Sequence, residues 1–324
     1  MGEPVIHFAV EKANRVLVIA HVDPDGDAIG SLTATGQALQ QLGKRVTLAC
    51  DDAVPQRFHY LPLATDVRRA PNTEIPYDLV IAVDCADEAR MGWAYASLPE
   101  PKPTLANIDH HITNDRFGAF NIVRPEASST AEVLCDFLSD IGATMTRGIA
   151  ESLLTGIVTD TMGFRTTNVT ANTLRAAADL VDHGANIAAI SLRALHQKPF
   201  ATAQMWGIGL SRMQFRDGLL WTSVSRDELR RAGVEGSPSS SGLVNFLADV
   251  DVAVVGLVLS EMADESVRVG MRAVPPYNVA EVAQRFGGGG HALAAGCTLD
   301  GPLEQAEAAV VAACLEAIQR QRPK

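Results

Sequence analysis

The feature that most constrains this fold is a series of short, continuous apolar runs in the first third of the chain. These runs cover residues 16–20, 46–49, 79–83 and 105–108. Continuous rather than alternating apolar residues are typical of strands in a parallel sheet that is covered on both faces. A helical pattern over residues 28–42, ended by Gly43, lies between the first two runs. This alternation predicts an α/β fold with a doubly wound, mainly parallel sheet, in which ligands bind beyond the carboxyl ends of the strands.

The rest of the sequence divides into a helical stretch and a second α/β pattern. Helical spacing marks residues 130–138, 147–158 and 171–181, and residues 186–204 form a connecting helix or linker. Farther on we expect strands at 218–222, 252–259 and 267–271, a polar loop at 235–242, and helices at 278–286 and 303–320. The predicted organisation is a larger domain over residues 1–188, a linker over 189–204 and a smaller α/β domain over 205–324. A cleft is expected between the two domains.

Composition limits the classes of partner. Of the 324 residues, 47% are hydrophobic and 20% are charged, which excludes wholesale disorder. The net charge of −11 argues against a broad basic groove for long nucleic acid, although bound metal ions can invert the local field for a small phosphorylated ligand. The five cysteines form no C-x-x-C pair, which predicts buried thiols in a reducing compartment. Without a signal-peptide profile or an apolar stretch of about 20 residues, we expect a cytoplasmic protein that does not contact membranes.

Residues 21–27 (HVDPDGD) concentrate charge at the end of the first predicted strand. Three carboxylates and an imidazole so close together are unfavourable unless a positive charge neutralises them. A helix N-terminus supplies only about half a charge, so divalent cations are the natural partner. Carboxylates with an imidazole favour Mn²⁺, Fe²⁺ or Zn²⁺ over Ca²⁺. The alternative is a polar turn in which Asp27 caps the helix.

Three further groups stand at element ends. Asp84 follows the run at 79–83, Asp109-His110-His111 follows the run at 105–108, and Asp160 lies at a helix end. Alone, each has an ordinary explanation: a turn cap, a solvated histidine pair, a loop acid. Because the carboxyl ends of parallel strands meet at one edge, we expect these groups to gather there. The set suits two metal ions that share a carboxylate. Its members are His21, Asp25, Asp27, Asp84, His110 and Asp160.

Two other segments carry candidate roles. In the second half, four glycines precede His291 and can bring backbone N–H groups close to an anion, while Arg272 can hold phosphate through two hydrogen bonds. The alternative for the glycines is a flexible helix cap. The candidate substrate-binding residues are Arg272, Gly288, Gly289, Gly290 and His291. Residues 128–132 (SSTAE) predict first a helix N-cap and only secondarily a substrate contact.

In order and spacing, these segments resemble the motifs of the DHH phosphoesterases. HVDPDGD, Asp84, the DHH triplet at 109–111 and Asp160 are similar to the four motifs of that family, and Arg272 with residues 285–296 (RFGGGGHALAAG) resembles its DHHA1 domain. The compact pair is similar to the nanoRNase and pAp-phosphatase branch, whose relatives include cyclic-di-AMP phosphodiesterases. One departure is Asp23, where many relatives carry Asn.

The resemblance implies roles for individual residues. One metal would be held by His21, Asp25 and Asp84, and the other by Asp27, Asp84, His110 and Asp160, with Asp84 bridging. His111 would face the scissile phosphate, which makes His111 and Asp84 the expected catalytic residues. The two divalent ions would be Mn²⁺, with Mg²⁺, Co²⁺ or Fe²⁺ as alternatives. The DHHA1 domain would bind the nucleotide.

The resemblance also implies the reaction. We expect a hydrolase that cleaves short oligoribonucleotides and linear dinucleotides such as pApA to mononucleotides, and pAp to AMP, through a metal-activated hydroxide. Cyclic-di-AMP is a further expected substrate. The alternatives are an inorganic pyrophosphatase-like enzyme, a RecJ-like exonuclease and a nucleotide-binding sensor without turnover. The partners expected are a short RNA or nucleotide and a second copy of the chain, with no long duplex.

Overall fold

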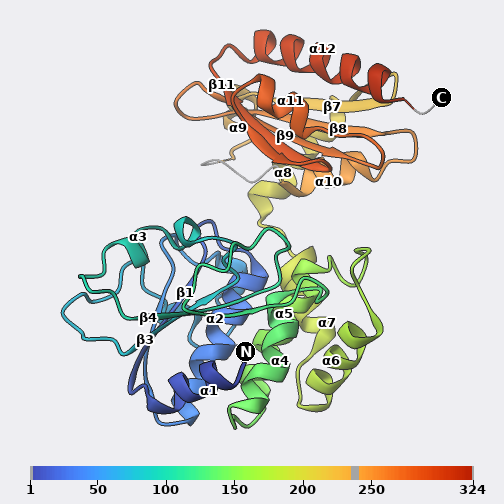
Figure 1. Cartoon of the computed structure of the whole chain (residues 1–324). Helices are drawn as coiled ribbons and strands as arrows, with labels where there is room; N and C mark the ends of the chain where they lie inside the picture. The colour runs from blue at the N-terminus through green and yellow to red at the C-terminus, as the bar shows by residue number, and fades with distance from the viewer. Residues whose placement is uncertain (1–2, 235–240, 323–324) are drawn as a thin grey trace. The chain divides into compact units, whose positions relative to one another are not determined.

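The computed structural model describes residues 3–234 and 241–322 (Figure 1). It divides into two compact units, Met1–Gln197 and Lys198–Lys324. The division falls inside the segment expected to link the two domains. Within the described ranges, no helix combines the length and hydropathy that crossing a membrane would require.

The first unit is built on a five-stranded sheet in which every neighbouring pair is parallel. The strand order is β2-β1-β3-β4-β5. The chain places β2 on one side of β1 and then returns to place β3, β4 and β5 on the other side. The strands are β1 (Arg15–Ala20), β2 (Arg45–Ala49), β3 (Leu79–Val83), β4 (Thr104–Asp109) and β5 (Phe120–Val123). All five residues of β3 are buried, which explains its uninterrupted apolar run. The predicted doubly wound α/β fold is confirmed.

Helices cover both faces of this sheet. One face packs against the long helices, and the other packs against a short helical segment around Met91, Ala94 and Tyr95. The helices are α1 (Glu3–Lys12), α2 (Gly26–Gln41), α3 (Gly92–Ala96), α4 (Thr130–Asp140), α5 (Arg147–Asp160), α6 (Ala171–Asp182) and α7 (Ile187–Ser191). In Figure 1, α2 (blue) and α5 (green) lie side by side.

The close contact between α2, α4 and α5 depends on two glycines, which have no side chain to keep the helices apart. A Cβ placed on Gly156 would lie 2.5 Å from Cβ of Ala131 and 2.6 Å from Oδ1 of Asp27. A Cβ on Gly26 would lie 2.3 Å from Oγ1 of Thr159. These glycines let the end of α5 come close to the start of α2, which brings Asp160 to the same edge as the strand ends.

The second unit is a six-stranded mixed sheet with the order β10-β11-β9-β8-β7-β6. Its strands are β6 (Gln214–Arg216), β7 (Leu219–Val224), β8 (Val255–Glu261), β9 (Val267–Ala273), β10 (Gly289–His291) and β11 (Ala294–Leu299). Its helices are α8 (Phe200–Ser211), α9 (Arg226–Arg231), α10 (Ser241–Ala248), α11 (Ala280–Arg285) and α12 (Leu303–Gln321). Helices α11 and α12 pack on one face, and α8 and α10 pack on the other.

The structure adds elements that the sequence pattern does not predict. The edge strands β5, β6 and β10 are only three or four residues long, too short for periodicity to reveal. Of the polar loop expected at 235–242, residues 235–240 lie outside the described residues, and Ser241 and Gly242 instead begin α10. The cysteines are free thiols, and all except the half-buried Cys135 are buried, as predicted.

Candidate metal and active site

The first motif leaves β1 at His21 and turns into α2. Asp25 is the N-cap of α2, because its Oδ1 accepts hydrogen bonds from the backbone N of Asp27 (2.9 Å) and of Ala28 (3.1 Å). The alternative that made Asp27 the cap is therefore wrong. The Nδ1 of His21 lies 2.7 Å from the carbonyl oxygen of Val22 and 3.1 Å from Nη2 of Arg90, so Nε2 is the nitrogen left for the cluster.

Asp27 is the most enclosed carboxylate of the motif, with 1% of its surface exposed. It accepts hydrogen bonds from the backbone N of Thr130 (2.7 Å) and of Ala131 (2.9 Å), the first two residues of α4. Burial and the nearby charge of Asp84 raise the pKa of Asp27 well above its ordinary value. Two amide donors at a helix N-terminus do not offset this, so additional positive charge beside Asp27 would be favourable.

Asp84 stands immediately after β3 with φ 61°, a left-handed backbone conformation that Asp tolerates better than most residues and that is common at functional sites. Its Oδ2 lies 3.5 Å from Nε2 of His21, and its Oδ1 lies 3.9 Å from Nε2 of His110. Burial works to raise the pKa of Asp84, but hydrogen bonding to His21 and the charges of the histidines lower it to about 2. The two oxygens of this carboxylate therefore face different histidines.

The DHH triplet closes the other side of the cluster. Nε2 of His110 lies 3.5 Å from Oδ2 of Asp160 and 4.0 Å from Oδ2 of Asp27. Asp160 is the last residue of α5, as the sequence predicts, and burial raises its pKa to about 6. Nδ1 of His111 donates to Oδ1 of Asp109 at 2.8 Å, and this bond raises the pKa of His111 to about 9. His111 keeps 40% of its side chain exposed, with Nε2 not engaged by Asp109.

The structure brings all six predicted ligands to one edge of the sheet. Their potential donor atoms form groups whose members lie within 4.8 Å of one another: one of His21, Asp25 and Asp84, and one of Asp27, His110 and Asp160. Asp84 also groups with His110 and His111, so it connects the two. Carboxylate oxygens with imidazole nitrogens form a donor set that suits divalent ions such as Mn²⁺. Buried, mutually repelling carboxylates fit a site built for cations.

Comparison with known proteins identifies the family. Residues 15–157 match the DHH family N-terminal domain, and residues 236–320 match the DHHA1 domain. The bifunctional oligoribonuclease and PAP phosphatase NrnA of Thermus thermophilus is 35% identical over 307 residues, which cover 94% of this chain and 90% of that protein. The chain belongs to the DHH–DHHA1 family. It is a phosphoester hydrolase, and members of the DHH family depend on metal.

Other relatives agree with this assignment. The Bacillus subtilis protein of the same description is 25% identical over 291 residues, covering 88% of this chain and 90% of its own length. An exopolyphosphatase-related protein of Bacteroides fragilis has the same fold, with a TM-score of 0.89 and 23% identity over 98% of this chain and 96% of that one. The exonuclease RecJ bound to manganese shares the fold more distantly, with a TM-score of 0.57 and 16% identity over 100% of this chain and 95% of its own.

The predicted substrate-binding residues of the DHHA1 domain lie on β9 and on or immediately before β10, the two strands that flank β11. Arg272 pairs with Ala294, and Ala294 pairs with His291, so the Arg272 and His291 side chains are on one face of the sheet, two strands apart. The next row on that face contains Gly270, Gly296 and Gly289, which leaves the surface between them flat.

The glycine run caps the C-terminal end of α11, where the N of Gly288 donates to the carbonyl oxygen of Ala283 at 2.9 Å, and then continues as strand β10. Gly287 and Gly290 have positive φ values of 73° and 136°. A Cβ on Gly288 would lie 2.2 Å from the carbonyl oxygen of Gly296. Gly289, in contrast, has open space where a side chain would be. The path of the run is therefore fixed by sterics, and its outer surface at Gly289 stays accessible.

Sequence reasoning did not find several residues that support the cluster. Asn114 donates to Oδ2 of Asp109 (2.6 Å) and to the carbonyl oxygen of Cys85 (2.9 Å), and Asn107 donates to Oδ1 of Asn114 (3.2 Å). Asn107 is fully buried in the middle of β4. A polar amide inside an apolar strand is the signal that could have shown this network.

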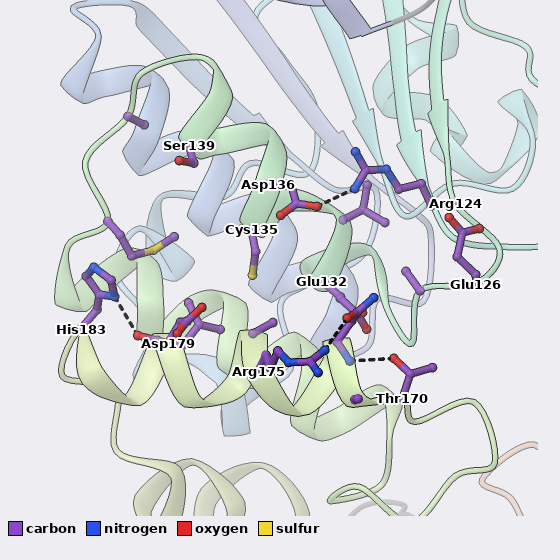
Figure 2. A pocket seen from close by; sticks show the side chains of 18 residues that line it. Arg124, Glu126, Glu132, Cys135, Asp136, Ser139, Thr170, Arg175, Asp179 and His183 are labelled. Atoms are coloured by element: carbon purple, nitrogen blue, oxygen red, sulfur yellow. Dashed lines mark hydrogen bonds and ion pairs between the residues drawn. The ribbon is translucent and has the colours of Figure 1, made fainter.

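A separate cavity of about 930 Å³ lies between α4 and α6 (Figure 2). Figure 2 shows the Arg124–Asp136 ion pair at one end and His183, bonded to the carbonyl oxygen of Asp179, at the other. Burial raises the pKa of Cys135, which lines the same cavity, far above that of a reactive thiol. None of the six predicted ligands lines this cavity, so it is distinct from the metal cluster.

Proposed function

We propose that this enzyme hydrolyses short oligoribonucleotides to mononucleotides and pAp to AMP, with two Mn²⁺ ions bound at the cluster. Linear dinucleotides such as pApA, and cyclic-di-AMP, belong to the same proposal. The observation that carries it is Asp84, whose two oxygens face His21 on one side and His110 on the other. A carboxylate shared in this way is what a pair of ions a few ångströms apart requires. The activities for which the Thermus and Bacillus relatives are named support the choice of substrates.

The proposal assigns a role to each residue of the cluster. His21, Asp25 and Asp84 would hold one ion, and Asp27, Asp84, His110 and Asp160 the other. When bound, the ions would lower the pKa of the attacking water and neutralise charge on the phosphoryl oxygens. Asp109 holds Nδ1 of His111, so Nε2 of His111 is the atom that would donate to a phosphoryl oxygen or to the leaving oxygen.

Arg272, His291 and the glycines 288–290 would bind the rest of the nucleotide. Arg272 is half-buried, and its Nη1 donates to the carbonyl oxygen of Met271 at 2.9 Å, so its guanidinium is held in place with donors still free for phosphate. We propose that the two domains span residues 1–188 and 205–324, with residues 189–204 as the linker. Family resemblance is also the basis on which we propose a homodimer that acts in the cytoplasm.

The test is hydrolysis of pAp, pApA, cyclic-di-AMP and pyrophosphate with Mn²⁺, by wild type and by Asp84→Asn. We expect wild type to cleave the nucleotides but not pyrophosphate. Asp84→Asn keeps the shape of the side chain and removes its charge, so kcat/KM should fall by more than about 100-fold. Circular dichroism should show that the variant is folded. A folded variant with wild-type activity on pApA would refute the proposal, and rapid cleavage of pyrophosphate alone would replace it with a pyrophosphatase.

A further inference from the structure

The first residue of α4, Thr130, contacts the carboxylate cluster through its side chain. Thr130 is fully buried, with 0% of its surface exposed. Its Oγ1 lies 2.8 Å from Oδ1 of Asp84 and 3.4 Å from Oδ1 of Asp109. A hydroxyl has a single proton to donate, and the shorter distance assigns that proton to Asp84.

The backbone of Thr130 contacts a second carboxylate of the cluster. Its N donates to Oδ2 of Asp27 at 2.7 Å, and the next amide, that of Ala131, donates to Oδ1 of Asp27 at 2.9 Å. Ser129 caps α4 by accepting from the backbone N of Glu132, which fixes the position of this first turn. One residue thus sets the positions of Asp27 and Asp84 relative to each other.

The hydroxyl also selects the orientation of the Asp84 carboxylate. Each carboxylate oxygen has two lone-pair directions. The Thr130 hydroxyl takes one of those on Oδ1, the oxygen on the His110 side, while Oδ2 remains on the His21 side. Rotating the carboxylate would break this bond between two buried groups, which is costly.

We propose that Thr130 is a positioning residue that holds Asp84 in the orientation in which its two oxygens serve the two ligand groups. The inference rests on the proposed two-ion function. Thr130 acts through Asp84 and needs no contact with substrate. Loss of an outer partner of a metal ligand weakens metal binding by about 10- to 100-fold, and that range sets the expected effect.

Thr130→Val removes the hydroxyl and keeps the shape, and Thr130→Ser keeps the hydroxyl. Thr35→Val is the matched control, because Thr35 is also fully buried and its hydroxyl has no hydrogen-bond partner among the described residues. Mn²⁺ binding to the metal-free full-length proteins is measured by calorimetry, and spin coupling between bound ions by electron paramagnetic resonance. Steady-state kinetics with pAp follow.

For Thr130→Val we expect Mn²⁺ binding weakened by about 10- to 100-fold and loss of the coupled signal, with kcat reduced more than KM changes. Thr130→Ser should stay within about threefold of wild type, and Thr35→Val should match wild type. If Thr130→Val does not fold, Thr130→Ala is compared with Thr130→Ser, since these two differ only in the hydroxyl.

The outcomes separate the two proposals. If Thr130→Val binds two coupled ions as tightly as wild type, the positioning role is wrong and the two-ion function stands. If Thr35→Val weakens binding as much as Thr130→Val does, the effect belongs to core packing and the positioning role is again wrong. If wild type itself binds fewer than two ions and cleaves none of the nucleotides, the proposed function fails and this inference fails with it.

Discussion

Metal binding should stabilise the first unit by an amount that can be worked out. Without a cation, Asp27 and Asp84 are buried beside each other and Asp160 is close by, and this repulsion is present only in the folded chain. At a concentration 100 times its Kd, one bound ion adds about 2.7 kcal/mol of unfolding free energy. For a unit of about 200 residues, each kcal/mol raises Tm by about 2–4 °C. One Mn²⁺ should therefore raise Tm by about 5–11 °C, and two independent ions by about twice that.

This stabilisation by Mn²⁺ should depend on pH, and the raised pKa of Asp160 determines whether it increases or decreases with pH. Because the folded-state pKa of Asp160 is raised to about 6, the metal-free folded protein binds a proton that the unfolded chain has released. The contribution of Asp160 to the free energy of unfolding of the metal-free protein is therefore present at low pH and is lost as pH rises from about 4 to about 6. Mn²⁺ needs the ionised carboxylate, so the Mn²⁺-dependent gain in Tm should be smaller at pH 5 than at pH 7.5.

Differential scanning fluorimetry of the chelated protein, with and without Mn²⁺, measures both effects. Asp160→Asn should lose about half of the Mn²⁺-dependent gain in Tm, the share of the one ion that Asp160 would hold, and should reduce the pH dependence of the metal-free Tm. Asp182→Asn is the matched control, since Asp182 is an exposed aspartate at the end of the neighbouring helix α6. An equal gain in wild type and Asp160→Asn, or an equal gain at pH 5 and pH 7.5, would refute the reasoning.

Three further predictions concern support, packing and substrate binding. Asn114→Ala removes the amide that donates to Asp109, so kcat should fall by about 10-fold or more with little change in KM, as steady-state kinetics with pAp would show. Gly156→Ala forces a Cβ against α4 and should destabilise the first unit by about 1–3 kcal/mol in urea unfolding, while Gly207→Ala, with open space, should be neutral or slightly stabilising. Arg272→Lys loses the two-pronged guanidinium and should raise KM for pAp about 10-fold without lowering Tm; an unchanged KM would show that Arg272 does not hold phosphate.

The sequence predicts most of the fold because the fully buried central strands of the sheet have a recognisable pattern of apolar residues. Both β1 and β3 are covered on two faces, so nearly all of their residues are apolar and their ends are sharply marked by polar residues. His21 and Asp84, the residues that follow β1 and β3, belong to the cluster, and His110 after β4 joins them. The short edge strand β5 buries one residue, Ile122, and leaves no such pattern.

The supporting residues could not be chosen in the same way, because their role lies in contacts between distant segments. Thr130 lies 46 residues from Asp84, and a threonine after a serine cap has an ordinary explanation as part of a helix start. The hydroxyls of Thr33 and Thr161 donate to carbonyl oxygens of their own helices. Only the folded chain shows that the Thr130 hydroxyl donates to Asp84 instead. Asn107 is the exception: an amide in a fully buried strand needs a partner, and its partner Asn114 leads directly to Asp109. A polar residue inside an apolar strand is therefore a sequence signal that predicts the residues supporting such a site through hydrogen bonds.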